Sequence, residues 1–430
     1  MRAMRTGTEI ARSEPLSVET RQNGMPSHDS RSVGGASAWY LRYSGSATVR
    51  FSAASRSIIT FAVLAACIAL TYLCSALSAP PNIDDRAWVD RSLQPLYAPR
   101  LEGNYYYAVH HPSFMRLVYS VVLHRMGVYE VRRPLVSYNK DRDWNIEHGA
   151  WIPYEIGMPL RYVNVAFLSG MIALLYFAFK RMFRNRALAL IACIPILWNP
   201  PVRDGVCIYI GCDSALLFWL AAFWFVWLVT DRRGAGGVIA LAAVGGVLAS
   251  TKINGAFALA GAVLYYALSS KGARRIIYPA ALIAIPAAVF LAMNPIYRAG
   301  NVNWTISVVR NMLRIMFNLK EATSTVEWAH FTKLEILREA FPYWFFAVPI
   351  LAVFTTARSE KWFRPTVAWA AATAGLNWVL IYVPMLRYDA PISMSFLVLF
   401  DASAIFFLAE LLKRTVGSGT QAAPAAEGTR

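Results

Sequence analysis

The fold is decided by two adjoining stretches, IITFAVLAACIALTYLCSALSA at residues 58–79 and PPNIDDRAWVDRSLQPLYAPRLEGNYYYAVHHP at residues 80–112. The first is long enough to cross a bilayer, because a spanning helix needs about 20 apolar residues. The second opens with Asp84 and Asp85 and carries tyrosines, which gather at the boundary between membrane and water. If the chain carries out chemistry, we expect it at this boundary.

The composition is that of a protein that crosses the membrane many times. Of the 430 residues, 57% are hydrophobic and 16% are charged, whereas a soluble domain has about 25% charged residues. The net charge of +17 comes from Lys and Arg in short segments between apolar runs, which is typical of cytoplasmic loops and argues against nucleic-acid binding. Cys207 and Cys212 share one loop and are spaced to allow a disulfide or a metal site.

Basic clusters separate the apolar runs and all fall on one side of the membrane. The predicted spans are 58–79, 161–179, 188–198, 214–230, 238–248, 253–268, 276–293, 341–354, 366–383 and 391–412. The shorter runs need helices that extend into flanking polar residues. Because Lys- and Arg-rich loops stay in the cytoplasm, both termini are predicted to be cytoplasmic. The sequence thus predicts an all-α polytopic membrane protein with about ten transmembrane helices.

The predicted topology leaves a large first loop on the extracytoplasmic side. The predicted parts are a disordered cytoplasmic tail at 1–55, a transmembrane domain at 56–414 with extracytoplasmic loops at 80–160 and 297–340, and a disordered cytoplasmic tail at 415–430. The tails lack apolar periodicity, which is why we expect disorder. Residues 114–126 are apolar but interrupted by charges, which favours a helix lying in the headgroup region.

Asp84 and Asp85 are the first candidates for chemistry. A carboxylate at the bilayer surface can take a proton from an attacking hydroxyl or bind a divalent cation. Adjacent side chains project in different directions, so we expect only one of the two to point into a given cavity. The alternative is a solvated pair of carboxylates beside Arg86.

His110 and His111 precede Pro112 at the head of the interfacial helix. Proline suits a first helical turn, whose free N–H groups attract phosphate, so His111 is a candidate contact for a phosphate or a leaving group. The alternative is a histidine that lies in the tyrosine-rich belt. Four of the six histidines lie in the first loop, but their spacing matches no standard zinc pattern.

Asp213, Lys252 and Arg387 lie at span ends on the same predicted side as Asp84. This shared side favours a functional role over simple anchoring at the interface. An arginine offers phosphate a fork of two donors, although an Arg387–Asp389 ion pair is the alternative.

The order of these features resembles the GT-C membrane glycosyltransferases, particularly the branch of the protein O-mannosyltransferases and the lipid A aminoarabinose transferases. The matching motifs are Asp84-Asp85 after the first span, His111-Pro112-Ser113 heading a helix, Asp213 opening a span, Thr251-Lys252-Ile253 entering another, and Arg387-Tyr388 before the last. The resemblance covers roughly residues 58–412. The chain differs from the family pattern in its Asp-Asp pair, in Ser113 for a proline and in Ile253 for a glycine.

The resemblance implies transfer of a sugar from a polyprenyl-phosphate donor to a hydroxyl of a lipid, glycan or protein at the extracytoplasmic face, with inversion at the anomeric carbon. The implied site consists of catalytic Asp84 and Asp85, phosphate-binding His111, Lys252 and Arg387, and the further residues Asp213, His110 and Tyr388. Its place in the motif favours Asp84 over Asp85 as the base. A divalent cation is the one cofactor that the carboxylates would suit. The Ala- and Arg-rich composition favours a bacterial inner membrane.

A non-enzymatic membrane protein is the alternative: a transporter or flippase of lipid-linked sugars, or a scaffold subunit of the cell envelope. A transporter predicts charged or broken helices at the bilayer midplane and often two related halves. Here the ionisable residues gather at span ends and no halves repeat, which favours an enzyme.

Overall fold

A computed structural model describes residues 53–78, 83–93, 113–131, 142–231, 234–294, 360–380 and 386–419. Within these ranges all regular structure is helical. The chain divides into two compact units, Met1–Ala54 and Ser55–Arg430, and almost all described residues belong to the second. The predicted span 341–354, the predicted loop 297–340 and the two histidines His110 and His111 lie outside the described residues.

The first predicted span is one nearly continuous helix, in which α1 (Ala53–Ile68) and α2 (Cys74–Leu77) are joined by a π-helical turn, η2 (Ala69–Leu73). The other helices are α3 (Ile83–Leu93), α5 (Ser113–Arg125), α6 (Arg142–Glu147), α7 (Tyr154–Phe183), α8 (Arg186–Leu197), α9 (Pro200–Val206), α10 (Asp213–Thr230), α11 (Ala235–Thr251), the 3-10 turn η3 (Ile253–Gly255), α12 (Ala256–Ser269), α13 (Arg274–Met293), α18 (Phe363–Leu380) and α19 (Leu386–Gly419).

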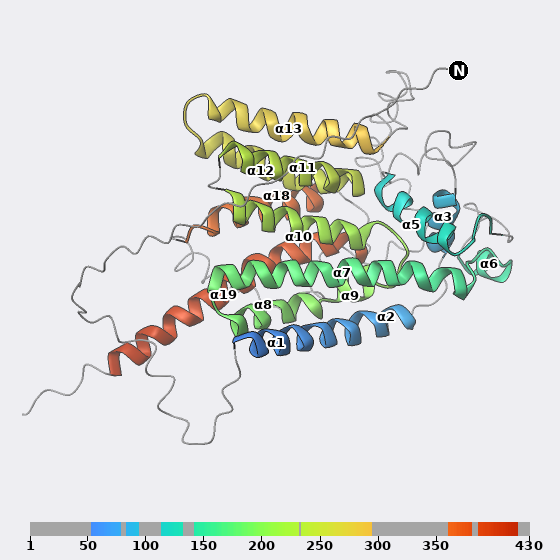
Figure 1. Ribbon diagram of the computed structural model, residues 1–430, viewed down its shortest axis with the longest axis horizontal. Helices are drawn as coiled ribbons and strands as arrows, with labels where there is room; N and C mark the ends of the chain where they lie inside the picture. Colours follow the sequence, from blue (N-terminus) through green and yellow to red (C-terminus); the bar gives the residue numbers. More distant parts are fainter. Residues whose placement is uncertain are drawn as a thin grey trace, which may run out of the picture. The chain divides into compact units, whose positions relative to one another are not determined.

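The long helices of the second unit run side by side (Figure 1). Helix α10 packs between α7 and α11, α11 packs on α13, and α12 packs on α13 and α18. Helix α19 packs on α18, α8 and α9. The short helices α3 and α5 pack on each other at one end of these helices, and α5 also contacts α7 and α11.

The structure confirms an all-α polytopic membrane protein. Four helices of the described part are long and apolar enough to cross a membrane, namely Tyr154–Phe183, Asp213–Thr230, Arg274–Met293 and Ala390–Leu412. Every predicted span inside the described ranges coincides with a helix. Several of these helices are shorter or less apolar, so the number of ten spans stays a prediction.

Two segments that the sequence placed in loops are helical. Asp84 and Asp85 belong to the first turn of α3, where the positive end of the helix dipole stabilises carboxylates. The segment directly before the last predicted span is also helical, because Arg387 and Tyr388 lie in the first turn of α19. The helix predicted at 114–126 is confirmed as α5.

The turn between α7 and α8 is built by two residues with local roles. Arg184 ends α7 in the left-handed conformation, with φ 53°. The Asn185 side chain then accepts hydrogen bonds from the N–H groups of Ala187 and Leu188, at 2.9 and 3.2 Å, and so caps α8. Basic residues surround this turn, which marks the end of α7 that is predicted to face the cytoplasm.

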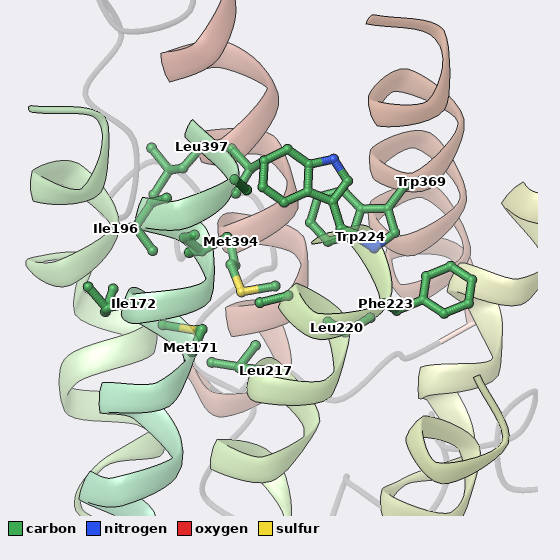
Figure 2. Packing of buried hydrophobic residues seen from close by; sticks show 14 of the residues in the cluster. Met171, Ile172, Ile196, Leu217, Leu220, Phe223, Trp224, Trp369, Met394 and Leu397 are labelled. Carbon is green, nitrogen blue, oxygen red and sulfur yellow. The ribbon is translucent and has the colours of Figure 1, made fainter. Parts of the chain in front are cut away.

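The main core lies between α7, α8, α10, α18 and α19 (Figure 2). The rings of Trp224 on α10 and Trp369 on α18 stack with centroids 5.6 Å apart. The indole N–H of Trp224 donates to the Thr366 hydroxyl at 3.0 Å, which satisfies a buried donor. Because lipid tails are as apolar as these side chains, the packing contacts themselves hold the helices together.

A second, smaller core holds α3 and α5 against the bundle. Its buried members are Trp88, Val89, Met115, Tyr119, Leu123, Val131, Ile152, Leu160, Ile210, Cys212 and Ala215. They come from α3, from α5 and the segment after it, from the start of α7 and the residues just before it, from the loop 207–212 and from the start of α10. This core holds α3, which carries Asp85 as well as Trp88 and Val89, against the loop that leads into Asp213.

Helices α12 and α18 approach each other closely at Gly261. A Cβ atom built there would lie 2.4 Å from the carbonyl oxygen of Ala368 and 2.9 Å from the Cβ of Ala372. Backbone atoms cannot move aside as a flexible side chain can, so only glycine fits without separating the two helices.

We predict that Gly261→Ala lowers the free energy of unfolding by about 1–3 kcal/mol, the usual cost of overpacking. Gly375→Ala is the matched control, because a Cβ atom at Gly375 on α18 meets no atom within 4 Å. Alanine is the better helix former there, so this change should be neutral or stabilising. Unfolding of both variants in detergent measures the difference, and equal stability would contradict the close packing.

Candidate functional site

Lys252 and Asp213 form a buried ion pair at the end of the bundle where α3 and α5 lie. The Lys252 ammonium is 2.5 Å from Oδ1 of Asp213. Asp213 lies in the first turn of α10, where the helix dipole favours a negative charge. Lys252 follows the last residue of α11 with an extended backbone, φ −156° and ψ 137°, before η3 begins. The break between the helices therefore directs the lysine to the start of α10.

An ammonium has three N–H donors, so Lys252 can hold Asp213 and further acceptors together. Its charge is kept beside a carboxylate in a site with little solvent, where electrostatic interactions are stronger than in water. The pair joins two residues that the sequence analysis had placed on one side of the membrane.

Asp85 is fully buried, and both of its carboxylate oxygens accept hydrogen bonds. Oδ2 accepts from Nη2 of Arg161 at 3.0 Å, and Oδ1 accepts from the backbone N–H of Ile210 at 2.7 Å. Arg161 lies on α7 and Ile210 lies in the loop 207–212. Asp85 thus ties α3 to α7 and to the loop that leads into Asp213.

Asn164 organises the same loop from the next turn of α7. Its Nδ2 donates to the Tyr209 carbonyl at 2.6 Å, while its Oδ1 accepts from the Ser214 hydroxyl at 2.8 Å. The Tyr119 hydroxyl of α5 lies 2.7 Å from both Asn164 Oδ1 and the Gly211 carbonyl, and it accepts from the Gly211 N–H at 3.2 Å. Asn164 and Tyr119 therefore hydrogen-bond with the backbone of Tyr209 and Gly211 and with the Ser214 hydroxyl.

Burial raises the pKa of the Tyr119 hydroxyl well above its usual value, and the nearby charges of Asp85 and Asp213 raise it further. Tyr119 is therefore a neutral hydrogen-bond donor at physiological pH. Its ring meets Trp88 edge to face with centroids 6.2 Å apart, which fixes its position from the α3 side.

The start of α5 is fixed by the end of α13. The Ser113 N–H donates to Asn294 Oδ1 at 2.6 Å, and Asn294 Nδ2 donates to the Phe290 carbonyl at 2.7 Å. Asn294 is fully buried. The residues directly before Ser113 are the predicted His110-His111-Pro112 step, so this contact anchors the helix that the step heads.

The structure describes the side chains of only some of the predicted site residues. Asp213, Lys252 and Asp85 lie at one end of the bundle, as shown above. Asp84 is the second residue of α3, and its side chain lies outside the described residues, as do the side chains of Arg387 and Tyr388. His110 and His111 lie wholly outside them. The roles of all eight residues stay predictions.

Four residues of this cluster were not predicted from the sequence: Arg161, Asn164, Tyr119 and Asn294. Arg161 and Asn164 carried a usable signal, because charged and amide side chains within or beside an apolar run are costly unless they have partners. Tyr119 and Asn294 carried none, because a tyrosine or an asparagine at a helix end is common at the interface.

Cys207 and Cys212 do not form the disulfide that their spacing allowed; both are buried free thiols. Burial raises the pKa of the Cys207 thiol to about 12, and the thiol donates to the Tyr72 carbonyl at 3.1 Å. A protonated thiol is a poor metal ligand. Among the described residues no three His, Cys, Asp or Glu side chains gather into a metal site.

Comparison with solved structures identifies the fold. ArnT from Cupriavidus metallidurans bound to undecaprenyl phosphate matches 87% of this chain and 67% of its own, with 16% identity and a TM-score of 0.52. The Archaeoglobus fulgidus oligosaccharyltransferase tethered with an acceptor peptide matches 90% of this chain and 52% of its own, with 11% identity and a TM-score of 0.54. This chain has the GT-C fold.

The chain spans about half the length of the oligosaccharyltransferase and two thirds of ArnT. No family model and no curated protein matches the sequence.

We predict that Arg161→Met lowers the free energy of unfolding by about 3–5 kcal/mol, because it leaves the buried Asp85 carboxylate without its charged partner. The side chains of this pair are 8% and 1% exposed. Arg203→Met is the matched control, because Arg203 pairs with Asp204 at 38% and 40% exposure. That change should cost at most about 1 kcal/mol. Similar losses for both variants in denaturant unfolding would contradict an anchoring role for Asp85.

Proposed function

We propose that this protein is an integral membrane glycosyltransferase that moves a sugar from a polyprenyl-phosphate donor to a hydroxyl acceptor. The GT-C fold supports this class of activity. ArnT was solved with undecaprenyl phosphate bound, and the oligosaccharyltransferase with an acceptor peptide, so related bundles bind a lipid phosphate and an acceptor. The observation that carries the proposal is the buried Lys252–Asp213 pair at the end of the bundle where α3 carries two aspartates in its first turn.

The orientation of α7 supports an extracytoplasmic site. Arg161 and Asn164 lie at the site, and Lys180 and Arg181 end the same helix. At 1.5 Å per residue these two pairs of residues are about 25 Å apart along α7, close to the thickness of a bilayer core. Because basic residues favour the cytoplasmic side, the site would face away from the cytoplasm, in a bacterial inner membrane.

The proposed reaction is a direct displacement. The acceptor oxygen attacks the anomeric carbon of the sugar, and the bond between that carbon and the phosphate oxygen breaks. The polyprenyl phosphate leaves with the bonding electrons, and a carboxylate takes the proton of the acceptor hydroxyl. One displacement inverts the anomeric carbon.

We assign the base to Asp84 and an anchoring role to Asp85. Both oxygens of Asp85 already accept hydrogen bonds from Arg161 and Ile210. A base must exchange a proton with the acceptor, which Asp85 cannot readily do while both of its oxygens hold α3 in place, so its neighbour in the motif is the candidate. Asp85 would then hold α3 in place, and Asp84 would act as the base.

The departing phosphate needs positive charge, for which we propose Lys252, Arg387 and His111. Asp213 would hold Lys252 in place through their ion pair. His110 and Tyr388 flank two of these groups in the sequence and would complete the site.

The test is sugar transfer in membranes supplied with a panel of radiolabelled undecaprenyl-phosphate sugars. We predict that Asp84→Asn lowers the rate by about 100-fold or more, the usual contribution of a general base. Asp90→Asn is the control, because Asp90 lies on the same helix and pairs with Arg86 at 2.8 Å. Addition of EDTA tests whether a divalent cation takes part.

A double variant, Asp84→Asn with Asp85→Asn, decides the catalytic assignment. If it is inserted and folded yet transfers sugar at the rate of the unmodified protein, neither aspartate is the base. A rate loss in Asp90→Asn equal to that in Asp84→Asn would point to a general effect on α3 instead.

One observation favours the alternative of a transporter or flippase. Asp401 lies within the last predicted span, contrary to the expectation that ionisable residues gather at span ends. Its side chain is buried, and its Oδ2 has no hydrogen-bond partner in the part of the chain that the structure describes. A buried carboxyl at membrane depth is typical of proton-coupled transport. Flipping of a labelled polyprenyl phosphate in proteoliposomes, without sugar transfer and abolished by Asp401→Asn, would support that alternative.

A further inference from the structure

A second polar site lies at the opposite ends of the helices that carry the Lys252–Asp213 pair. It is a pocket of about 530 Å³ whose main lining residues are Asp231, Tyr265, Tyr266, Lys271, Arg274 and Tyr278. Asp231 follows α10, which begins with Asp213. At 1.5 Å per residue the pocket and the ion pair are therefore about 27 Å apart, so they are separate sites.

The acidic residue of the pocket is already committed to tyrosines. The hydroxyls of Tyr265 and Tyr266 donate to the two oxygens of Asp231, at 3.1 and 3.2 Å. The rings of both tyrosines contact Trp227, and Tyr266 also meets Tyr278 edge to face with centroids 5.8 Å apart. Both carboxylate oxygens of Asp231 therefore already have a hydroxyl donor.

The pocket also contains two basic residues, Lys271 and Arg274. Within the described ranges, neither Lys271 nor Arg274 forms an ion pair. Both lie near the start of α13, whose first turn has no acidic residue and carries Arg275 as well. The N-terminal end of a helix carries a partial positive charge, which repels cations placed beside it. A bound anion would offset that repulsion. The pocket therefore favours a negatively charged ligand.

Apolar side chains next to the pocket indicate that the ligand has a lipid part. Ile276 and Ile277 follow Arg274 on α13 and are 75% and 58% exposed. On α12, Leu264 and Leu268 directly precede the lining residues Tyr265 and Ser269 in the sequence and are 60% and 69% exposed. In a membrane protein such side chains face acyl chains, so a headgroup in the pocket would have its chains along these helices.

We propose that this pocket binds the phosphate of a membrane phospholipid, with Lys271 and Arg274 as its charged contacts. A lysine and an arginine with one phosphate between them is a common arrangement for recognising this group. Ser270 also lines the pocket and supplies a hydroxyl donor, whereas the Ser269 hydroxyl donates to the Tyr265 carbonyl at 2.7 Å. The site is independent of sugar transfer and of the proposed donor.

The test measures binding of three probes to the purified full-length protein by native mass spectrometry. Phosphatidylglycerol has both phosphate and chains, diacylglycerol has the chains alone, and glycerol phosphate has the phosphate alone. We expect phosphatidylglycerol to bind at least about tenfold more tightly than diacylglycerol, since charge-assisted hydrogen bonds to phosphate are lost without it.

Lys271→Gln with Arg274→Gln should weaken phosphatidylglycerol binding by about tenfold or more. Ser270→Glu should also weaken it, because it adds a negative charge and removes neither cation. Lys180→Gln with Arg181→Gln is the control: it makes the same change in net charge at the end of α7, outside the pocket. Thermal unfolding of each variant checks that the fold is kept.

If glycerol phosphate binds as tightly as phosphatidylglycerol, the phosphate site is supported and its ligand is a soluble phosphate compound. Unchanged phosphatidylglycerol binding in both pocket variants would overturn the proposal. An equal loss in the Lys180 and Arg181 control would overturn it as well, because net charge alone would then explain the effect.

Discussion

A buried ion pair fixes the end of the bundle on which the proposed chemistry depends. The side chains of Lys252 and Asp213 are 9% and 11% exposed, and a charge at that depth costs several kcal/mol unless it has a partner. The pair therefore holds the first turn of α10 against the break between α11 and η3. Helices α3 and α5 and the loop 207–212 pack around this junction, so the pair sets where all these elements meet.

The adjacent aspartates of α3 show how one short helix can serve both the fold and a reaction. Asp85 is bound by Arg161 and by the Ile210 N–H, which gives α3 one orientation on the bundle. A fixed α3 is what a base at Asp84 would require, because proton transfer demands a donor and an acceptor within hydrogen-bond reach. Structural and catalytic carboxylates next to each other are therefore a consistent arrangement.

Sequence reasoning could predict the helices and the shared side of Asp213 and Lys252, because apolar length and loop charge are local signals. It could not predict that Tyr119 contacts Asn164, or that Asn294 caps α5, because those contacts join residues 45 and 181 positions apart. It also placed the acidic pair in a loop, since a short helix with few apolar residues has weak periodicity. These contacts and the helical state of the acidic pair depend on tertiary packing, which a local sequence pattern does not report.

The most direct measurement is an experimental structure of the protein with undecaprenyl phosphate bound. We expect the phosphate to lie about 3 Å from the Lys252 ammonium, the distance of a charge-assisted hydrogen bond, beside the first turn of α3. Phosphate density remote from Lys252, with the Lys252–Asp213 pair unchanged and the lipid elsewhere on the bundle, would contradict the claim that this end of the GT-C fold binds the donor.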